Sequence, residues 1–309
     1  MLKNSLEAIL YYTSYPLLWV ISRLPFTVVY WISDFVYFIV YYVINYRKDV
    51  IRGNLKIAFP ELNEEQIKKL HRQNMKHFCD MFIEMIKSMG MSEKQMLKRF
   101  TCENVDLVNQ YAGSSKPIIC MYGHQASYEW TMALTKQMDF NVFGVYKPLR
   151  NKKFDGLIRR IREKFNAQLI PMKQASTKMR SQSKKGNVFF ALVADQAPKR
   201  GRSSDFTKFF NRPTAVFRGG ERFGKKYDGV VVFLRVTKIK RGYYTSRYEL
   251  VTDSGASTED WFITDKFFNL LEDQIRKQPA YYLWSHKRWR TIPAEKYATA
   301  DFSPTIESP

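Results

Sequence analysis

The two residues best suited to chemistry are His124 and Glu129, in the segment MYGHQASYEW. His124 follows the short apolar run 116–122 (KPIICMY), which ends at Gly123, and Glu129 comes five residues later. On one continuous helix, five residues place two side chains about 140° apart, so this pair can meet only across a strand-to-helix turn. A carboxylate there would fix the tautomer of the imidazole and stabilise its cation, while the other ring nitrogen takes a proton from a hydroxyl. Alternatively, His124 is a polar residue at the end of a strand and has no catalytic role.

Other kinds of site are not indicated. The sequence contains no Walker A loop, no GxGxxG, no GxSxG and no HExxH motif. Its three cysteines, Cys79, Cys102 and Cys120, are widely spaced without a CxxC pair, which is typical of thiols in a reducing compartment. We therefore expect neither a disulfide framework nor a metal site, and no cofactor.

The remaining histidines have simpler interpretations. His71 and His77 belong to a helical segment without a metal-ligand set, and solvation or a hydrogen-bonding partner explains them. His286 lies beside Lys287 and Arg288 without an orienting carboxylate nearby in the sequence, so a catalytic role is not favoured.

The elements that must position His124 alternate between strands and helices. Apolar residues recur at helical spacing over about 64–89, where Asn63 before two glutamates is suited to cap the helix. The other predicted elements are strands at 116–122, 142–145, 168–171, 187–194, 229–239 and 243–252, and helices at 155–165, 174–185 and 259–277. This alternation predicts an α/β fold with a mixed sheet flanked by helices.

The first 46 residues differ from the rest. Residues 6–22 and 24–46 are apolar and aromatic, and the four charges, Lys3, Glu7, Arg23 and Asp34, cancel. A run of about 20 apolar residues is long enough to cross a bilayer, and tyrosine and tryptophan favour its interface. The segment predicts either one span or a bent helical hairpin broken near Arg23–Pro25; an aromatic core helix is the alternative. Basic residues follow at once, which places the body on the cytoplasmic side.

Charge and composition narrow the class of protein. The chain has 309 residues and a net charge of +21, all of it carried by residues 47–309. A mean hydropathy of −0.38 excludes a polytopic membrane protein, and 16% aromatic residues exclude disorder. An apolar N-terminal segment (1–46) followed by a basic body (47–309) indicates a protein that binds to an anionic surface. Nine basic residues between Lys199 and Lys226 predict a surface that binds phosphorylated lipid headgroups, an acidic carrier protein, or both. The alternative is a basic surface that faces only solvent.

The His124–Glu129 segment resembles the HX4D/E signature of membrane glycerolipid-type acyltransferases, and specifically that of the bacterial lipid A late acyltransferases, which carry Glu at the second position. Three further blocks resemble that family in the same order: 47–70 (RKDVIRGNLKIAFPELNEEQIKKL), 144–165 (GVYKPLRNKKFDGLIRRIREKF) and 193–201 (VADQAPKRG). A fourth, 280–291 (AYYLWSHKRWRT), resembles its closing block. Lys147 stands where arginine is usual.

The resemblance implies an enzyme that moves a fatty acyl chain from acyl carrier protein to a hydroxyl of a lipid A precursor. By this resemblance His124 is the general base and Glu129 its partner. Lys147 or Arg150 would bind a phosphate group or stabilise the oxyanion. Asp195 would belong to the site by supporting the residues that contact the reacting groups. The acceptor is then a phosphorylated glycolipid, the donor is acyl carrier protein or a coenzyme A thioester, and the location is the bacterial inner membrane.

These expectations divide the chain into a membrane-anchoring segment (1–46), a helical region on the core (47–100), an acyltransferase core (101–292) and a polar tail (293–309). Two alternatives stay open. The first is acylation of another lyso-lipid, such as an aminolipid or a lysophospholipid, and the second is a non-catalytic membrane scaffold. A nucleic-acid-binding protein is disfavoured because the sequence contains no helix-turn-helix, zinc-finger or RNA-stacking signature.

Overall fold

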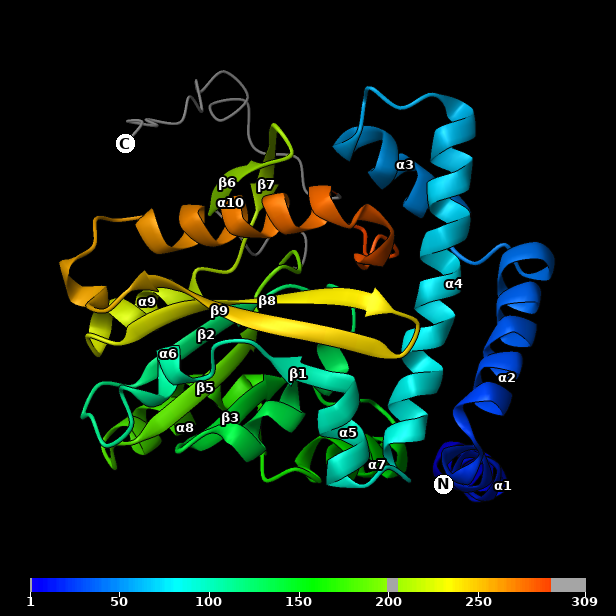
Figure 1. Ribbon diagram of the computed structural model, residues 1–309, viewed down its shortest axis with the longest axis horizontal. Helices are drawn as coiled ribbons and strands as arrows, with labels where there is room; N and C mark the ends of the chain where they lie inside the picture. Colours follow the sequence, from blue (N-terminus) through cyan, green and yellow to red (C-terminus); the bar gives the residue numbers. More distant parts are fainter. Residues whose placement is uncertain (1, 199–204, 290–309) are drawn as a thin grey trace.

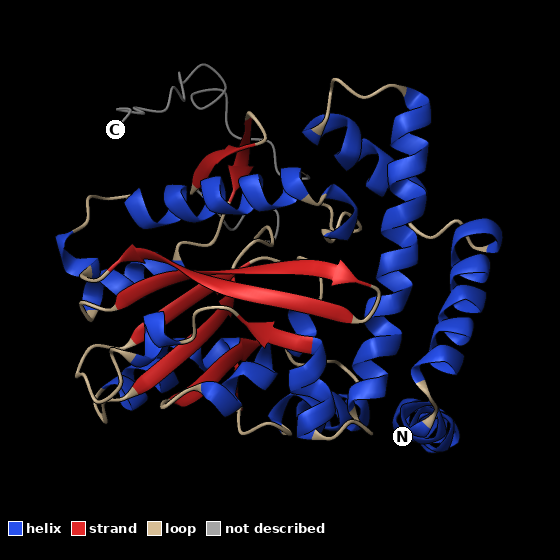
Figure 2. Ribbon diagram, in the orientation of Figure 1, coloured by secondary structure: helices blue, strands red, loops and turns tan. Residues whose placement is uncertain are grey.

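A seven-stranded mixed sheet forms the centre of the body (Figures 1 and 2). The structure is a computed structural model, and it describes residues 2–198 and 205–289. The strand order is β1-β9-β8-β2-β5-β3-β4, with every neighbouring pair parallel except β8 and β9. The strands are β1 (Phe100–Cys102), β2 (Ile118–Tyr122), β3 (Asn141–Tyr146), β4 (Gln168–Pro171), β5 (Val188–Val193), β8 (Val230–Lys240) and β9 (Tyr243–Thr252). A separate hairpin pairs β6 (Phe206–Phe209) with β7 (Arg212–Ala215).

The sheet is buried on both faces because its central strands are apolar throughout. In β2 all five residues are buried. Ile119 and Met121 enter one core cluster, whereas Ile118, Cys120 and Tyr122 enter the other. This alternation follows from the two-residue period of a strand.

Helices cover both faces. One core contains α10 (Phe262–Lys277), α8 (Ala175–Ser183) and parts of α3 (Lys48–Ala58) and α4 (Glu64–Ser88). The other contains α5 (Glu93–Arg99), α6 (Asp106–Asn109) and the 3₁₀ helix η2 (Tyr128–Gln137). The remaining elements are α1 (Leu2–Arg23), α2 (Phe26–Phe38), the π-helical turn η1 (Ile39–Val43), α7 (Lys152–Glu163), η3 (Met172–Gln174), α9 (Gly219–Lys226), η4 (Gly255–Ser257) and η5 (Pro279–Tyr281).

The sequence predictions agree with this architecture in class and in most elements. The structure confirms the mixed α/β sheet, the strands and helices expected after residue 116, and the break between the first two helices at Arg23–Pro25. Asn63 caps α4 through a capping box with Gln66, as its position predicts. The β6–β7 hairpin, β1 and α9 were not expected. The four-part division of the chain stays a prediction, and its tail, 293–309, lies outside the described residues.

Candidate active site

His124 lies in the loop that follows β2, at the carboxyl end of the parallel strands. Gly123 begins this loop, and a Cβ there would collide with Leu271 of α10. The loop is held by the segment after η5: the N–H of Ala126 donates to Tyr281 O at 2.8 Å, and that of Leu283 donates to His124 O at 3.0 Å. Ala126 has a φ of +50°, a left-handed conformation that these bonds maintain.

The partner of the imidazole is Asp195, which follows β5, the parallel neighbour of β2. Its Oδ1 lies 2.5 Å from His124 Nδ1, and its Oδ2 accepts the His124 backbone N–H at 3.1 Å. Asp195 is ionised, so its carboxylate accepts a hydrogen bond from a protonated Nδ1. In the neutral imidazole ring, Nε2 then carries no proton. His124 Nε2 lies 3.2 Å from the side-chain nitrogen of Gln196, and 14% of the His124 side chain is exposed. This contact fixes the orientation of the imidazole ring, with Nδ1 toward Asp195 and Nε2 toward Gln196.

The electrostatics of Asp195 support this arrangement. Burial alone would raise the pKa of this carboxyl, whose side chain is 2% exposed. The electrostatic interaction of the carboxylate with His124 and its two hydrogen bonds from that residue outweigh burial and lower the pKa of Asp195 to about 2. The carboxylate is therefore ionised at physiological pH, and a negative charge in this position favours the protonated form of a neighbouring imidazole.

Glu129 has a different partner from the expected one. It lies in the first turn of η2, and its carboxylate accepts two hydrogen bonds from Arg162 of α7, at 2.7 and 2.8 Å. In the described structure the hydrogen bonds of the His124 ring go to Asp195 and Gln196, so the expected His124–Glu129 contact is not made. The ring of Tyr128 packs edge-on against His124 at 4.7 Å. The orienting carboxylate comes from the neighbouring strand, which spacing along the chain does not reveal.

The Arg162–Glu129 pair is largely buried, with the Glu129 side chain 8% exposed. Burial by itself would lower the pKa of Arg162, but the charge of Glu129 and its hydrogen bonds raise it. The sequence predicts only a helix at 155–165 and does not single out Arg162, because its partner Glu129 lies in a different element.

Lys147 and Arg150 lie in the loop between β3 and α7. Both side chains are exposed. The loop itself is held by Asp155, which accepts from Leu149 N at 2.7 Å and from Tyr146 OH at 3.3 Å. Because β3 is parallel to β5, this loop leaves the sheet at the same edge as His124 and Asp195. The two cations are therefore placed at the rim of the site, and their roles stay predictions.

The closing block completes the site from the other side. Asn54 of α3 donates to the carbonyls of Trp284 and His286 at 2.8 and 2.7 Å, and Asn74 of α4 donates to those of Ala280 and Tyr282. His286 Nε2 accepts the N–H of Ala197 at 3.1 Å. The first and last blocks of the sequence resemblance thus pack on each other beside the catalytic loop.

Arg288 is a further residue that the sequence did not single out. Its side chain is 2% exposed, and its guanidinium lies over the rings of Phe209 and Phe268 at 5.6 and 5.2 Å. None of its three guanidinium nitrogens has a hydrogen-bond partner within the described parts of the chain. Its charge helps to lower the pKa of Asp195.

The basic segment around Lys199–Lys226 is only partly described, since Lys199, Arg200 and Arg202 lie outside the described residues. Arg218 pairs with the buried Glu221 at 3.0 Å and with Asp260, and Arg222 pairs with Asp205 at 2.9 Å. Glu221 also accepts from Trp261 N and Thr264 N at the start of α10. Glu221 thus joins α9 to the start of α10.

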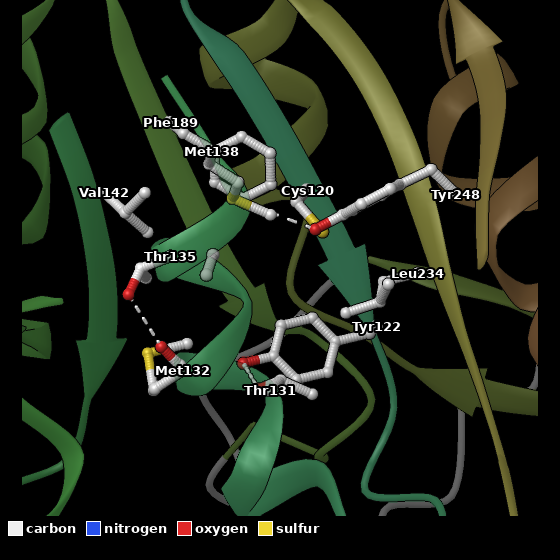
Figure 3. A pocket seen from close by; sticks show the side chains of 11 residues that line it. Cys120, Tyr122, Thr131, Met132, Thr135, Met138, Val142, Phe189, Leu234 and Tyr248 are labelled. Atoms are coloured by element: carbon white, nitrogen blue, oxygen red, sulfur yellow. Dashed lines mark hydrogen bonds between the residues drawn. The ribbon is translucent and has the colours of Figure 1, made fainter. Parts of the chain in front are cut away.

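Two pockets lie near the catalytic loop. One small pocket adjoins His124; its lining is mostly apolar and consists of Asn74, His77, Phe78, Met81, His124, Ala126, Tyr128, Tyr281, Tyr282 and Leu283. The other lies beneath η2 between Tyr122 and Met132, and neither His124 nor Asp195 lines it (Figure 3). In residues 2–198 and 205–289 no three His, Cys, Asp or Glu side chains are grouped to hold a metal ion.

The fold and the site define an α/β protein with a hydrogen-bonded His–Asp pair at the carboxyl ends of its parallel strands, beside a small and mostly apolar pocket. Comparison with known proteins makes the class specific. The family model for bacterial lipid A biosynthesis acyltransferases matches residues 3–291. The chain therefore belongs to the bacterial lipid A biosynthesis acyltransferase family, and it is an acyltransferase of lipid A biosynthesis.

Curated relatives agree with this assignment. The chain is 22% identical over 281 residues to the lipid A biosynthesis palmitoleoyltransferase of Escherichia coli K12, covering 89% of each chain. It is 21% identical over 280 residues to the lipid A biosynthesis lauroyltransferase of the same organism, covering 89% of this chain and 90% of the relative. A lipid A biosynthesis acyltransferase of Haemophilus influenzae is 21% identical over 254 residues, which cover 81% and 79%.

Proposed function

We propose that this enzyme transfers a fatty acyl chain from acyl carrier protein to a free hydroxyl of a phosphorylated lipid A precursor, with His124 as the general base. The observation that carries this mechanism is the short contact between His124 Nδ1 and the buried carboxylate of Asp195. It leaves Nε2 as the basic nitrogen, beside a small pocket whose lining is mostly apolar. No covalent enzyme intermediate is needed, because the acceptor hydroxyl is itself the nucleophile.

The proposed reaction is a direct displacement at the thioester. The acceptor hydroxyl replaces the Gln196 amide next to His124 Nε2, gives its proton to that nitrogen and attacks the thioester carbonyl. The tetrahedral intermediate collapses to the new ester and expels the carrier thiolate, which takes the proton back from Nε2. Asp195 stabilises the imidazolium between these two steps.

The oxyanion of that intermediate requires hydrogen-bond donors. The backbone N–H groups directly after Gly123 are engaged: His124 N donates to Asp195, Gln125 N to Gly123 O and Ala126 N to Tyr281 O. We assign the role to the first N–H groups of η2, which have no partner within their own helix.

The remaining assignments follow the same reaction. Lys147 and Arg150, exposed at the rim, would bind phosphate groups of the acceptor or of the carrier's phosphopantetheine arm. The Glu129–Arg162 pair would hold the start of η2, and through it the oxyanion donors, in place. The proposed location is the bacterial inner membrane with the body on the cytoplasmic side; residues Phe26–Val43 form the one described helix long and apolar enough to cross a bilayer.

The test is a lipid A mass measurement in a strain lacking this gene. We expect the deletion to remove one acyl chain and wild-type protein to restore it. His124→Ala should fail to restore it, with transfer slower by about 10²–10⁴-fold in isolated membranes. His71→Ala, which removes a histidine of α4 outside the pocket lining, is the matched control and should restore the mass.

Two outcomes would contradict parts of the proposal. Loss of a chain from another lipid class, with lipid A unchanged, would show that the acceptor is wrong. Equal rates with acyl carrier protein and coenzyme A thioesters in membranes would show that the donor assignment is wrong.

A further inference from the structure

Helices α1 and α2 with η1 expose many large apolar side chains to the outside. Of the nineteen large apolar side chains exposed in the described structure, twelve lie between residues 9 and 44. They include Trp19, Trp31, Phe35, Phe38, Tyr42 and Val43, with Trp31 67% exposed. An exposed apolar surface of this kind marks a contact with lipid or with another protein.

The opposite side of α2 is packed against the body along α4 (Figure 1). Val29 and Ser33 are fully buried there. Ser33 Oγ donates to Asp80 at 2.7 Å, and Tyr30 OH donates to Glu84 at 2.8 Å, both residues of α4. The turn between β8 and β9 approaches so closely that a side chain at Gly242 would collide with the hydroxyl of Tyr30.

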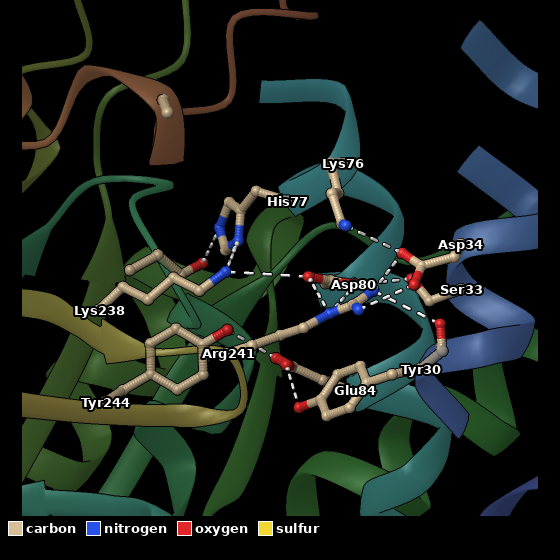
Figure 4. Close-up of polar contacts among 12 residues, drawn as sticks. Tyr30, Ser33, Asp34, Lys76, His77, Asp80, Glu84, Lys238, Arg241 and Tyr244 are labelled. Carbon is tan, nitrogen blue, oxygen red and sulfur yellow. Dashed lines mark hydrogen bonds and ion pairs between the residues drawn. The ribbon is translucent and has the colours of Figure 1, made fainter. Parts of the chain in front are cut away.

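Asp34, on the same side of α2, belongs to a cluster of charges (Figure 4). Arg241 contacts Asp34 at 2.7 Å and Asp80 at 2.6 Å, and Lys76 of α4 lies 3.3 Å from Asp34. These ion pairs fix α2 to the two elements beside it, α4 and the β8–β9 turn.

This packing excludes a crossing. The apolar stretch Phe26–Val43 has 18 residues, about 27 Å of helix at 1.5 Å per residue, and would just span a hydrocarbon core of about 30 Å. Its midpoint falls at Asp34 and Phe35. A crossing helix in this position would bring Arg241, Asp80 and Lys76 to the centre of the bilayer, where charges are strongly disfavoured.

Helix α1 is also held on the body, and it does not run antiparallel to α2. Figure 1 shows α1 nearly along its axis while α2 lies in the plane of the view. Lys153 and Arg160 of α7 donate to the hydroxyls of Tyr12 and Tyr11, each at 3.0 Å, and the buried Lys87 donates to Ser22 O at 2.8 Å. A hairpin that crosses and returns would require two helices side by side.

We propose that α1, α2 and η1 insert their outward apolar faces into one leaflet of a membrane without crossing it. The N-terminus and the catalytic body then lie on the same side. Aromatic side chains suit this depth, and the basic residues beside the surface, Arg23, Arg47, Lys48 and Lys76, attract anionic headgroups. The inference rests on the proposed membrane location of the enzyme and resolves the choice between a span and a hairpin.

Cysteine labelling of the full-length protein in spheroplasts tests the topology. Thr27→Cys lies at the turn between α1 and α2, which faces the periplasm if α2 alone crosses and also if both helices cross. We expect a membrane-impermeant maleimide to leave it unlabelled until detergent is added, as with the control Lys184→Cys on the body. The wild-type chain, with its three native cysteines, measures the background. Labelling of Thr27→Cys from outside intact spheroplasts overturns the proposal.

Membrane fractionation gives a second readout. The double variant Trp31→Glu, Phe35→Glu places two charges on the outward face, and we expect at least a tenfold rise in its soluble fraction. Ile239→Glu, which alters an equally exposed apolar residue of β8, should leave the fraction unchanged. Unchanged membrane binding of the double variant overturns the proposal. So does disulfide cross-linking of Trp31→Cys to a second copy, which would assign this face to self-association.

Neither readout depends on catalysis. If the enzyme acylates lipid A but Thr27→Cys is labelled from outside, only the topology is overturned. If Thr27→Cys stays unlabelled but no lipid A acylation occurs, only the proposed function is overturned.

Discussion

At the residue scale, the reactivity of His124 depends on side chains far from it in the sequence. Asp195 comes from the next parallel strand, and the buried Arg288 contributes positive charge near that carboxylate. A buried carboxylate and a buried guanidinium are each costly when alone. Their shared environment keeps Asp195 ionised, which the basic nitrogen of His124 requires.

Asp195→Asn tests this dependence. The asparagine amide would donate to His124 Nδ1, favour the tautomer with a proton on Nε2 and remove the base. We expect acyl transfer in isolated membranes to fall by about 10²–10⁴-fold with the thermal midpoint little changed. Asp139→Asn, at a loop away from His124, is the control. A rate close to wild type in Asp195→Asn would contradict the assigned tautomer.

At the scale of elements, the site depends on how η2 is held against α7. The Arg162–Glu129 ion pair is the bidentate contact between them, and it fixes the first turn of η2 next to Tyr128 and His124. A carboxylate so fully paired with arginine is a positioning group for that turn. This placement also accounts for the five-residue spacing from His124 without direct contact between the two side chains.

Arg162→Ala leaves a buried carboxylate unpaired, which typically destabilises a protein by about 3–5 kcal/mol. We expect a lower thermal midpoint and strongly reduced acyl transfer, with partial recovery of both in Arg162→Lys. Arg159→Ala removes an exposed arginine of the same helix and should change little. If Arg162→Ala kept its stability while losing activity, the pair would act on the substrate and not on η2.

At the scale of the whole molecule, one buried polar network joins the N-terminal helices to the catalytic loop (Figure 4). Glu84 accepts from Tyr30 of α2 and Tyr244 of β9, each at 2.8 Å. Lys238 of β8 lies 3.8 Å from Asp80 and 3.2 Å from His77 Nδ1, and His77 Nε2 lies 3.3 Å from Ala126 O. Helix α4 carries three of these residues and thus links the N-terminal helices to the loop of His124.

Glu84 makes the stability of this network depend on pH. Burial is the largest cause that raises its pKa, to about 7, against an unfolded value near 4.5. A group whose pKa is raised on folding stabilises the fold below its unfolded pKa and loses that contribution as pH rises through the folded one. We therefore expect stability to fall between about pH 4.5 and 7, and Glu84→Gln to flatten this dependence in thermal unfolding. An unchanged slope in Glu84→Gln would contradict this account.

The sequence by itself determined the class of fold, the position of His124 at a strand end and the family, because these depend on local periodicity and on motifs contiguous in the chain. The cap at Asn63 was also predicted, and a break near Arg23–Pro25 belonged to one of the two predictions for the N-terminal segment. Only the tertiary structure decided that Asp195 orients His124, that Glu129 pairs with Arg162 and that α2 packs on α4 through Asp34. These contacts join residues of different elements, and strand order and helix packing, which spacing along one chain does not encode, bring them together.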